Sequence, residues 1–350
     1  MTDNEHPEPV PRRKKRVFLL AAIILITLAG AGYWYVEHEF ASPAAGPGRK
    51  TILFKVSPGM GLKKISRALG DKGIIKYPAI FELQARLRGG ASRIRSGTYK
   101  LSPSMPPWCI YQDLIKGHVA QNGFTIPEGF NLKEIATVIE KAGFGDRKEV
   151  LSLARDPAFL KNLKIQAPTL EGYPFPDTYR FPLETSPRRI LNRMVKNLRR
   201  KFSPSLRRLA HEQNLTIHET LTLASVIEKE TAVGSERPII AAVFINRLKI
   251  GMRLQSDPTV IYSLPNFDGN IRKKDLAFDS PYNTYRYKGL PPGPIASPGL
   301  ASIRAALNPA PVKYLYFVAN REGGHKFSRT YREHRLAVGR YQIRKRKVDR

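Results

Sequence analysis

Three glutamates within nine positions are the side chains of this sequence best suited to acid–base chemistry. The stretch 223–237 reads LASVIEKETAVGSER and contains Glu228, Glu230 and Glu236. Residues 218–231 predict a helix with few exposed positions. On a wheel at about 100° per residue, Glu228 and Glu230 lie about 200° apart. They therefore cannot work as a close carboxylate pair.

Glu230 has the most apolar surroundings of the three glutamates. Val226 and Ile227 stand one turn before it, whereas smaller residues precede Glu228. Apolar surroundings raise a carboxyl pKa and keep the proton available near neutral pH. Glu230 is therefore the candidate catalytic acid, and the alternative is a buried carboxylate in an ion pair. Glu236 precedes a proline and is expected to interact with the N-terminus of the next helix.

Polar and aromatic residues after this segment are candidates for binding a substrate. A polar cluster comes before Pro258 and an apolar run that predicts a strand, and residues 280–299 form a long loop rich in Tyr, Asn, Pro and Gly. Tyrosine rings suit pyranose faces and amides suit sugar hydroxyls. A rigid structural loop is the alternative. The predicted binding residues are Asn246, Gln255, Ser256, Asp257, Tyr282, Asn283 and Tyr285.

Composition restricts the class of protein. The 350 residues are 42% hydrophobic and carry a formal net charge of +30, which indicates an anionic partner. The single cysteine, Cys109, excludes an intrachain disulfide framework and a multi-cysteine zinc site. We expect no metal and no cofactor. Nine Lys or Arg fall between Arg188 and Arg208, either as a solvated helix face or as a contact with an anionic polymer or lipid.

An uncharged apolar segment near the N-terminus predicts a membrane anchor. Residues 17–36, VFLLAAIILITLAGAGYWYV, would span roughly 30 Å as a helix, the thickness of a bilayer core. RRKKR precedes it, so the N-terminus is expected to be cytoplasmic. A cleaved signal peptide is the alternative. We expect a single-pass membrane protein whose residues after the apolar segment lie outside the cytoplasm, and therefore no nucleic-acid partner.

An internal repeat follows the anchor. Residues 54–73, FKVSPGMGLKKISRALGDKG, align without gaps with residues 124–143, FTIPEGFNLKEIATVIEKAG. Each copy predicts a strand, a glycine turn and an amphipathic helix. A second helix at 77–89 and a strand at 96–103 follow the first copy, which gives the strand–helix–helix–strand order of a LysM module, a binder of N-acetylglucosamine glycans. A short strand and a hairpin are expected at 313–328, and no partner for His325 can be named.

The segment 224–262, ASVIEKETAVGSERPIIAAVFINRLKIGMRLQSDPTVIY, resembles the signature of the endolytic murein transglycosylases, the YceG-like family. LEGYPFPDTYRF, SPYNTYRYKGLPPGPIASPG and YLYFVAN fall in that family's order and spacing. The resemblance covers roughly residues 51–335. It implies an inner-membrane lytic transglycosylase that cuts peptidoglycan strands internally and ends their elongation, with the second Glu of EKET, Glu230, as catalytic acid.

The resemblance also implies the chemistry. The MurNAc–GlcNAc β-1,4 bond would be cleaved without water, leaving 1,6-anhydro-MurNAc ends. Peptidoglycan strands, the membrane and wall-synthesis proteins are the expected partners. A non-catalytic peptidoglycan-binding anchor and a hydrolysing muramidase are the alternatives. The muramidase would need a second carboxylate, for which Asp257 is the candidate; otherwise Asp257 orients Gln255, caps a turn or stabilises charge on the sugar.

These expectations give an α+β protein with one transmembrane helix, a LysM-like βααβ module and a mixed α+β catalytic domain. The expected divisions are a cytoplasmic tail at 1–16, the transmembrane helix at 17–36, a linker at 37–50, the LysM-like module at 51–123, the catalytic domain at 124–340 and a basic tail at 341–350.

Overall fold

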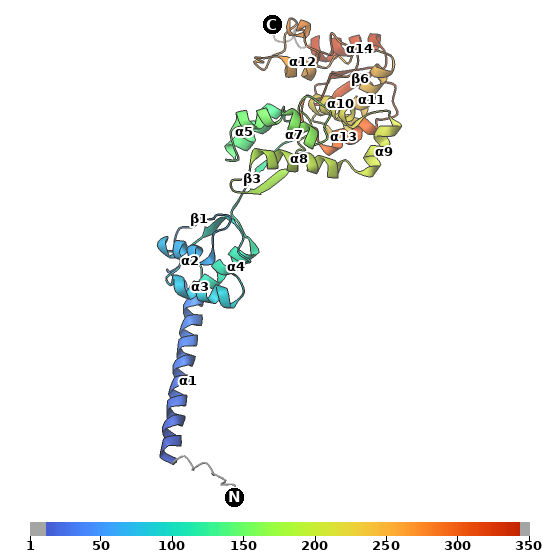
Figure 1. Cartoon of the computed structure of the whole chain (residues 1–350). Helices are drawn as coiled ribbons and strands as arrows, with labels where there is room; N and C mark the ends of the chain where they lie inside the picture. The colour runs from blue at the N-terminus through green and yellow to red at the C-terminus, as the bar shows by residue number, and fades with distance from the viewer. Residues whose placement is uncertain (1–11, 344–350) are drawn as a thin grey trace. The chain divides into compact units, whose positions relative to one another are not determined.

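The computed structural model describes residues 12–343 and separates the chain into two compact units, residues 1–121 and 122–350. Both units combine helices with short two-stranded sheets, which confirms the mixed α+β class (Figure 1). Most of the predicted cytoplasmic tail and of the predicted basic C-terminal tail lies outside the described residues. Each unit is considered by itself below.

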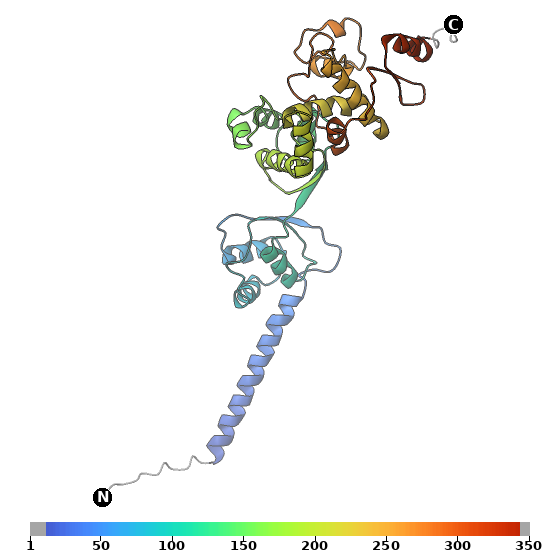
Figure 2. The same cartoon turned by 90° about the vertical axis from the view of Figure 1, so that its right-hand side faces the viewer.

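The first unit begins with one long helix. Its elements are α1 (Arg12–Ala41), β1 (Ile52–Val56), α2 (Leu62–Asp71), α3 (Pro78–Leu87), β2 (Gly97–Leu101) and α4 (Pro107–Lys116). Helix α1 is continuous in both views (Figures 1 and 2). Its segment from Arg16 to Ala41 is long and apolar enough to cross a membrane, with a mean hydropathy of 2.2. Near its end, Phe40 is buried against Phe81 and Tyr111.

The rest of the first unit has the predicted strand–helix–helix–strand order. β1 and β2 pair antiparallel, with Ile52 opposite Leu101, and α2 and α3 come between them in the chain. Apolar residues at helical spacing on α2 face the core of this unit: Leu62, Ile65 and Leu69 are buried. Glycan binding by this module stays a prediction.

Both copies of the repeat form the predicted strand, turn and helix. The second copy contains β3 (Gln121–Thr125) and α5 (Leu132–Lys141). Gly59 and Gly129 occupy matching turns with φ of +76° and +79°, and Gly73 and Gly143 follow the two helices with φ of +64° and +78°. Positive φ favours glycine, so the shared glycines have the same backbone role in each copy.

The second unit is mainly helical. Between α5 and α10 come α6 (Arg147–Leu153), α7 (Pro157–Asn162), β4 (Thr178–Pro182), α8 (Pro187–Lys201) and α9 (Pro204–Glu212). The remaining elements are α10 (Ile217–Glu230), α11 (Arg237–Lys249), α12 (Asp257–Ser263), α13 (Leu300–Leu307), β5 (Tyr316–Ala319), β6 (His325–Ser328) and α14 (Tyr331–Val338). β3 pairs with β4, and β5 pairs antiparallel with β6, which confirms the predicted hairpin.

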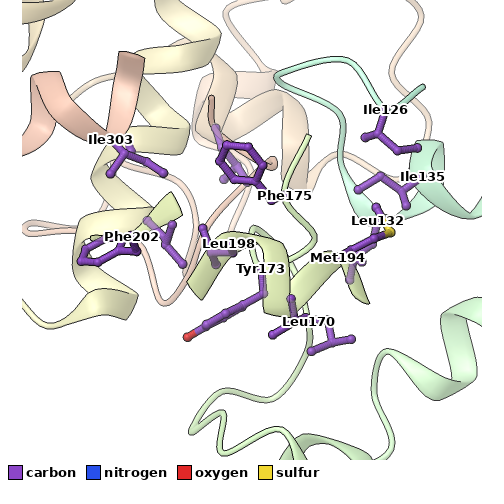
Figure 3. Packing of buried hydrophobic residues seen from close by; sticks show 14 of the residues in the cluster. Ile126, Leu132, Ile135, Leu170, Tyr173, Phe175, Met194, Leu198, Phe202 and Ile303 are labelled. Carbon is purple, nitrogen blue, oxygen red and sulfur yellow. The ribbon is translucent and has the colours of Figure 1, made fainter. Parts of the chain in front are cut away.

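The core of the second unit lies among α8, α10, α11 and α13. Helix α8 buries one apolar face, including Met194 and Leu198, while its basic residues stay outside. Figure 3 shows these side chains beside Leu170 and Tyr173 of the preceding loop, with Phe202 just beyond the end of α8. Removal of this apolar surface from water is the main force that holds the unit together.

The apolar run after Pro258 is a helix, so the strand predicted there is wrong. Asp257 and Pro258 begin α12, where an acid suits the positive end of the helix and a proline lacks only an N–H that would have no partner. The run is short, and periodicity alone does not distinguish a short buried helix from a strand.

Candidate active site

Helix α10 carries Glu230 to the edge of the core. Thr216 and Glu219 form a capping box at its start, with Thr216 Oγ1 accepting from the Glu219 N–H at 3.1 Å. Every residue from Thr220 to Ile227 is buried. The helix ends at Glu230, and Thr231 is extended. The carboxyl group is therefore held by a rigid helix at the point where that helix leaves the core.

Glu230 lines a cavity of about 390 Å³. The walls come from α10, α11, the start of α12, the loop 280–299, the β5–β6 hairpin and α14. The other lining residues are Arg247, Gln255, Asp257, Tyr285, Tyr316, Phe317, Val318, Ala319, His325, Tyr331, His334, Val338 and Gln342. Aromatic rings and a few polar groups around one carboxyl group are what a sugar-binding catalytic cleft requires.

Burial raises the pKa of Glu230 to about 7. A hydrogen bond donated by Ser256 Oγ to Glu230 Oε1 opposes this shift, and the negative charge of Asp257 adds to it. No salt bridge of Glu230 is present in the part of the chain that the structure describes. The raised pKa agrees with the helical-wheel argument and makes Glu230 able to give and take a proton near neutral pH.

Asp257 is the second carboxylate of the cavity. Tyr285 donates its hydroxyl to Asp257 Oδ1 at 2.5 Å, and burial together with this hydrogen bond raises the pKa of Tyr285. The cavity thus contains two carboxyl groups, Glu230 beside the hydroxyl of Ser256 and Asp257 beside the hydroxyl of Tyr285.

The segment before α12 is fixed by the loop 280–299. Ser256 donates its backbone N–H to Thr284 Oγ1 at 3.0 Å, and the N–H of Gln255 bonds to Thr284 O at 3.1 Å. Gln255 has a φ of +49°, a conformation uncommon for residues other than glycine. These contacts place Ser256 against Glu230 and direct Asp257 into the cavity.

The structure brings four of the predicted binding residues to the site. Gln255, Asp257 and Tyr285 line the cavity, and Ser256 contacts Glu230.

The other three predicted binding residues do not line this cavity, and each has a partner within the protein. Asn246 donates to Val312 O at 2.9 Å and to Tyr314 O at 3.0 Å. Asn283 is fully buried, with its amide bound to the carbonyls of 276 and 278. Tyr282 packs its ring on Tyr262, 4.9 Å between centroids. Polarity alone did not distinguish these residues from those of the cavity.

The other two glutamates of the segment bind protein partners. Glu228 is nearly buried, forms a salt bridge with Arg237 at 3.3 Å and accepts the N–H of Gly299 at 2.9 Å. The buried ion pair considered for Glu230 is therefore formed by Glu228.

Glu236 stands at the N-cap of α11, the helix start where the sequence placed it, and its side chain makes no capping hydrogen bond. It instead accepts two hydrogen bonds from His325, from the backbone N–H at 2.7 Å and from Nδ1 at 2.6 Å. His325 thereby acquires a partner that the sequence could not name.

One wall of the cavity was not predicted. Arg247 is buried and bonds to Leu315 O at 2.7 Å, and its guanidinium lies over the Tyr316 ring at 5.4 Å. His334 stacks on Tyr316, 5.2 Å between centroids, and Tyr331 is adjacent and exposed. Burial and the charge of Arg247 lower the pKa of His334. Tyr331 and His334 lie on α14, about 100 positions after Glu230 in the sequence, and no local pattern connected them with that glutamate.

A second buried acid, Glu171, was also missed. Glu171 accepts the N–H of Leu132, at the start of α5, at 3.0 Å and the hydroxyl of Tyr262, on α12, at 3.1 Å. Burial raises the pKa of Glu171 to about 7. Glu171 does not line the cavity; it ties the helix that begins with Asp257 to α5. A larger cavity of about 690 Å³ lies at the other end of α10 and contains neither Glu230 nor Asp257.

Comparisons with known proteins identify the family to which the chain belongs. The model of the YceG-like family matches residues 54–340. A protein of Bacillus subtilis named endolytic murein transglycosylase is 33% identical over 330 residues, 90% of this chain and 91% of that protein. A protein of Streptococcus pneumoniae with the same name is 30% identical, and the alignment covers 87% of this chain and 61% of the Streptococcus protein. The crystal structure of a yceG-like protein of Listeria monocytogenes is 36% identical, with a TM-score of 0.58 over 83% of this chain and all of that one.

A glutamate with a raised pKa, at the end of a buried helix and facing an aromatic-walled cavity, is an arrangement typical of enzymes that work by acid–base catalysis. The family match extends over most of both units and the relatives align over most of the chain. This chain belongs to the YceG-like family, as the resemblance of residues 224–262 predicted.

Proposed function

We propose that this protein is a membrane-anchored lytic transglycosylase that cleaves the MurNAc–GlcNAc β-1,4 bond inside peptidoglycan strands. The observation that carries the proposal is Glu230, whose pKa burial raises to about 7 in a cavity walled by tyrosines. A non-catalytic anchor has no need of a carboxyl group protonated near neutral pH. The names of the Bacillus and Streptococcus relatives support the same activity.

One carboxyl group suffices for the proposed reaction. Glu230 protonates the glycosidic oxygen as the C1–O bond breaks, and its carboxylate then removes the proton of the MurNAc C6 hydroxyl. That oxygen bonds to C1 and closes the 1,6-anhydro ring, so Glu230 ends protonated as it began. Because the nucleophile is part of the substrate, no water has to be activated.

The other cavity residues have supporting parts in this mechanism. Ser256 donates to Glu230 and orients its carboxyl group for both proton transfers. Asp257, held by Tyr285, places negative charge where the sugar becomes oxocarbenium-like. Arg247 is fixed by backbone carbonyls and limits how negative the cavity becomes.

Helix α1 would anchor the enzyme with its N-terminus in the cytoplasm and both units on the outer, periplasmic face of the cell inner membrane. Its length and composition and the basic residues before it support this arrangement. An enzyme held at the membrane meets new strands as they emerge. We propose that cleavage there ends the elongation of nascent strands.

A hydrolysing muramidase is the second candidate, because Asp257 lines the same cavity as Glu230. In that reaction Asp257 would act as base or nucleophile across the bond. Product analysis separates the two candidates. The purified full chain in detergent is incubated with peptidoglycan, and the products are weighed by mass spectrometry before and after borohydride.

The lytic reaction should give MurNAc ends lighter by one water that borohydride leaves unchanged. Early products should be chains of intermediate length. Reducible MurNAc ends would instead establish hydrolysis and make Asp257 the missing catalytic group. The Glu230→Gln protein should yield neither product.

A further inference from the structure

Two adjoining cavities form a trough at the start of α10, at the opposite end of the helix from Glu230. Their volumes are about 690 and 570 Å³, and both are lined by Lys164, Ile165 and Gln166. Small-molecule and peptide sites have volumes of this order. The proposed reaction uses neither cavity.

The trough has an apolar floor and a basic rim. Its floor includes Ile165, Val195, Leu198 and Phe202, all buried in the core beneath. Its rim holds five exposed cations, which are Arg155, Lys161, Lys164, Arg199 and Arg207. A site of this kind suits a ligand with several carboxylates and small apolar groups, and offers little to a neutral, hydroxyl-rich sugar.

The rim cations are not neutralised by acidic side chains. None of the five forms a salt bridge within residues 12–343. Arg199 donates to the carbonyl of Leu163 and Arg207 to that of Phe202. Glu219 is the acid that lines the trough, and its carboxylate is engaged by the N–H and hydroxyl of Thr216. Positive charge over an apolar floor is therefore available to a ligand.

We propose that this trough binds the peptide stems of peptidoglycan. This inference rests on the proposed function, because the stems belong to the same polymer. Stem peptides combine free carboxylates with alanine methyl groups, which is the chemistry of the rim and floor. The trough also gives a role to the rim residues Arg199 and Arg207, which belong to the basic run between Arg188 and Arg208.

The length of α10 determines which stem is bound. His218 lines the trough, and Glu230 lines the catalytic cavity. Glu230 stands 12 positions after His218 on α10, which corresponds to a rise of roughly 18 Å along the helix. An extended peptide of four residues spans at most roughly 14 Å. Because the stem is shorter than the distance between the two sites, a stem in the trough belongs to a sugar next to the cleaved bond and not to the sugar at the bond itself. The trough would therefore select strands that still carry their stems.

The trough also contacts the loop that lines the catalytic cavity. His218 donates from Nε2 to Pro292 O at 2.9 Å and accepts at Nδ1 from Tyr173 at 3.0 Å. Pro292 belongs to the loop 280–299, which also carries Tyr285. The loop 280–299 therefore extends from the trough to the catalytic cavity.

The test compares two charge reversals of equal size in the full chain. Lys161→Glu with Lys164→Glu changes the rim, where neither lysine side chain forms a hydrogen bond or salt bridge within the described residues. Arg189→Glu with Lys196→Glu changes two exposed residues of α8 outside the trough. Binding of N-acetyl-L-alanyl-γ-D-glutamyl-meso-diaminopimelic acid is measured by calorimetry. Cleavage is measured on strands with stems and on strands stripped of stems by an amidase.

We expect the rim variant to bind the peptide about tenfold more weakly than the wild type and to show a KM about tenfold higher on strands with stems. Its kcat, and its KM on stripped strands, should not change, and the α8 variant should match the wild type throughout. Equal behaviour of the two variants, or no peptide binding by the wild type, would overturn the proposal. Peptide binding that depends on the rim, in a protein that cleaves no strand, would refute the proposed function and leave the trough standing.

Discussion

The three glutamates of residues 223–237 differ in what their carboxylates contact. Glu228 neutralises Arg237, Glu236 binds His325, and Glu230 has a hydroxyl donor, Ser256, with no cation in a salt bridge. A salt bridge stabilises the charged form of a carboxylate and lowers its pKa. Burial has the opposite effect and raises the pKa, and the single hydroxyl beside Glu230 opposes only part of that rise. At the scale of the residue, this difference supports the proposal that Glu230 transfers the proton.

Glu230→Gln should abolish cleavage while leaving fold and glycan binding intact, because the amide keeps the shape of the side chain and loses the transferable proton. Loss of a general acid costs about 10²- to 10⁴-fold in rate. Glu236→Gln should retain most activity, since its carboxylate serves His325. Release of anhydro products from purified peptidoglycan is the measurement. An active Glu230→Gln enzyme would refute the assignment.

The stability of the Glu230→Gln protein should depend on pH in a defined direction. Burial raises the pKa of Glu230 from 4.5 to about 7, so the native state retains a proton that the unfolded chain releases between those values. The group therefore costs stability that grows as pH rises from about 4.5 to about 7 and is constant above. Relative to wild type, the Tm of Glu230→Gln should increase through that range.

Glu228→Gln is the control for this stability measurement. It removes the charged partner of the nearly buried Arg237 and should lower the Tm relative to the wild type. Thermal melts from pH 4 to 8 check both variants. A Tm difference between Glu230→Gln and wild type that does not change with pH would contradict the raised pKa.

At the scale of the element, α12 is the helix on which the site depends. Ser256 and Asp257 stand at its start, and Tyr262 near its end donates to the buried Glu171. The Thr259 hydroxyl and the Thr284 hydroxyl are 2.9 Å apart, which joins α12 to the loop 280–299. The short helix is therefore fixed along its length by residues from three segments of the chain.

Tyr262→Phe should lower the free energy of unfolding by about 1–3 kcal/mol, because it removes one of the hydrogen bonds to the buried Glu171 and leaves the N–H of Leu132 as its remaining partner outside the neighbouring residues. It should also reduce kcat more than it changes KM, since α12 positions Ser256 against Glu230. Denaturant unfolding and steady-state cleavage are the measurements. Tyr287→Phe, which alters a half-exposed tyrosine bound to Asp279, is the matched control and should change little. Equal effects of the two variants would exclude the role of α12.

At the scale of the whole molecule, the chain carries a helix able to cross a membrane, a module with the βααβ order and a mainly helical unit with the site. The formal net charge of +30 suits an anionic polymer outside the cell. Peptidoglycan, with carboxylates on its stems, is such a polymer. The apolar helix and the positive charge both support the proposal of an enzyme that works on strands close to the membrane.

Reporter fusions test the proposed topology. An enzyme active only outside the cytoplasm should be active when fused after Arg350 and inactive when fused at Pro11, because the RRKKR segment before the apolar run holds the N-terminus inside. Activities of the two fusions in intact cells are compared at equal expression. The reverse pattern would contradict both the topology and the compartment of the proposed substrate.

Local patterns in the sequence determined the elements and one functional residue. Periodicity gave the apolar helix, both copies of the repeat and α10, since these depend on side chains three or four positions apart. The same periodicity distinguished Glu230 from Glu228. The run after Pro258 was too short for this argument, and the helix α12 was predicted as a strand.

Only the tertiary structure decided which polar residues surround Glu230. Arg247, Tyr316 and His334 come from elements distant in the chain, and they meet Glu230 because α11, the β5–β6 hairpin and α14 pack around one cavity. Asn283 is as polar as the residues of the cavity, but its amide donates to two backbone carbonyls. The type of a side chain determines which hydrogen bonds and ion pairs it is able to form. Packing over long sequence separations determines which partner it finds, and this information is not contained in any local stretch of sequence.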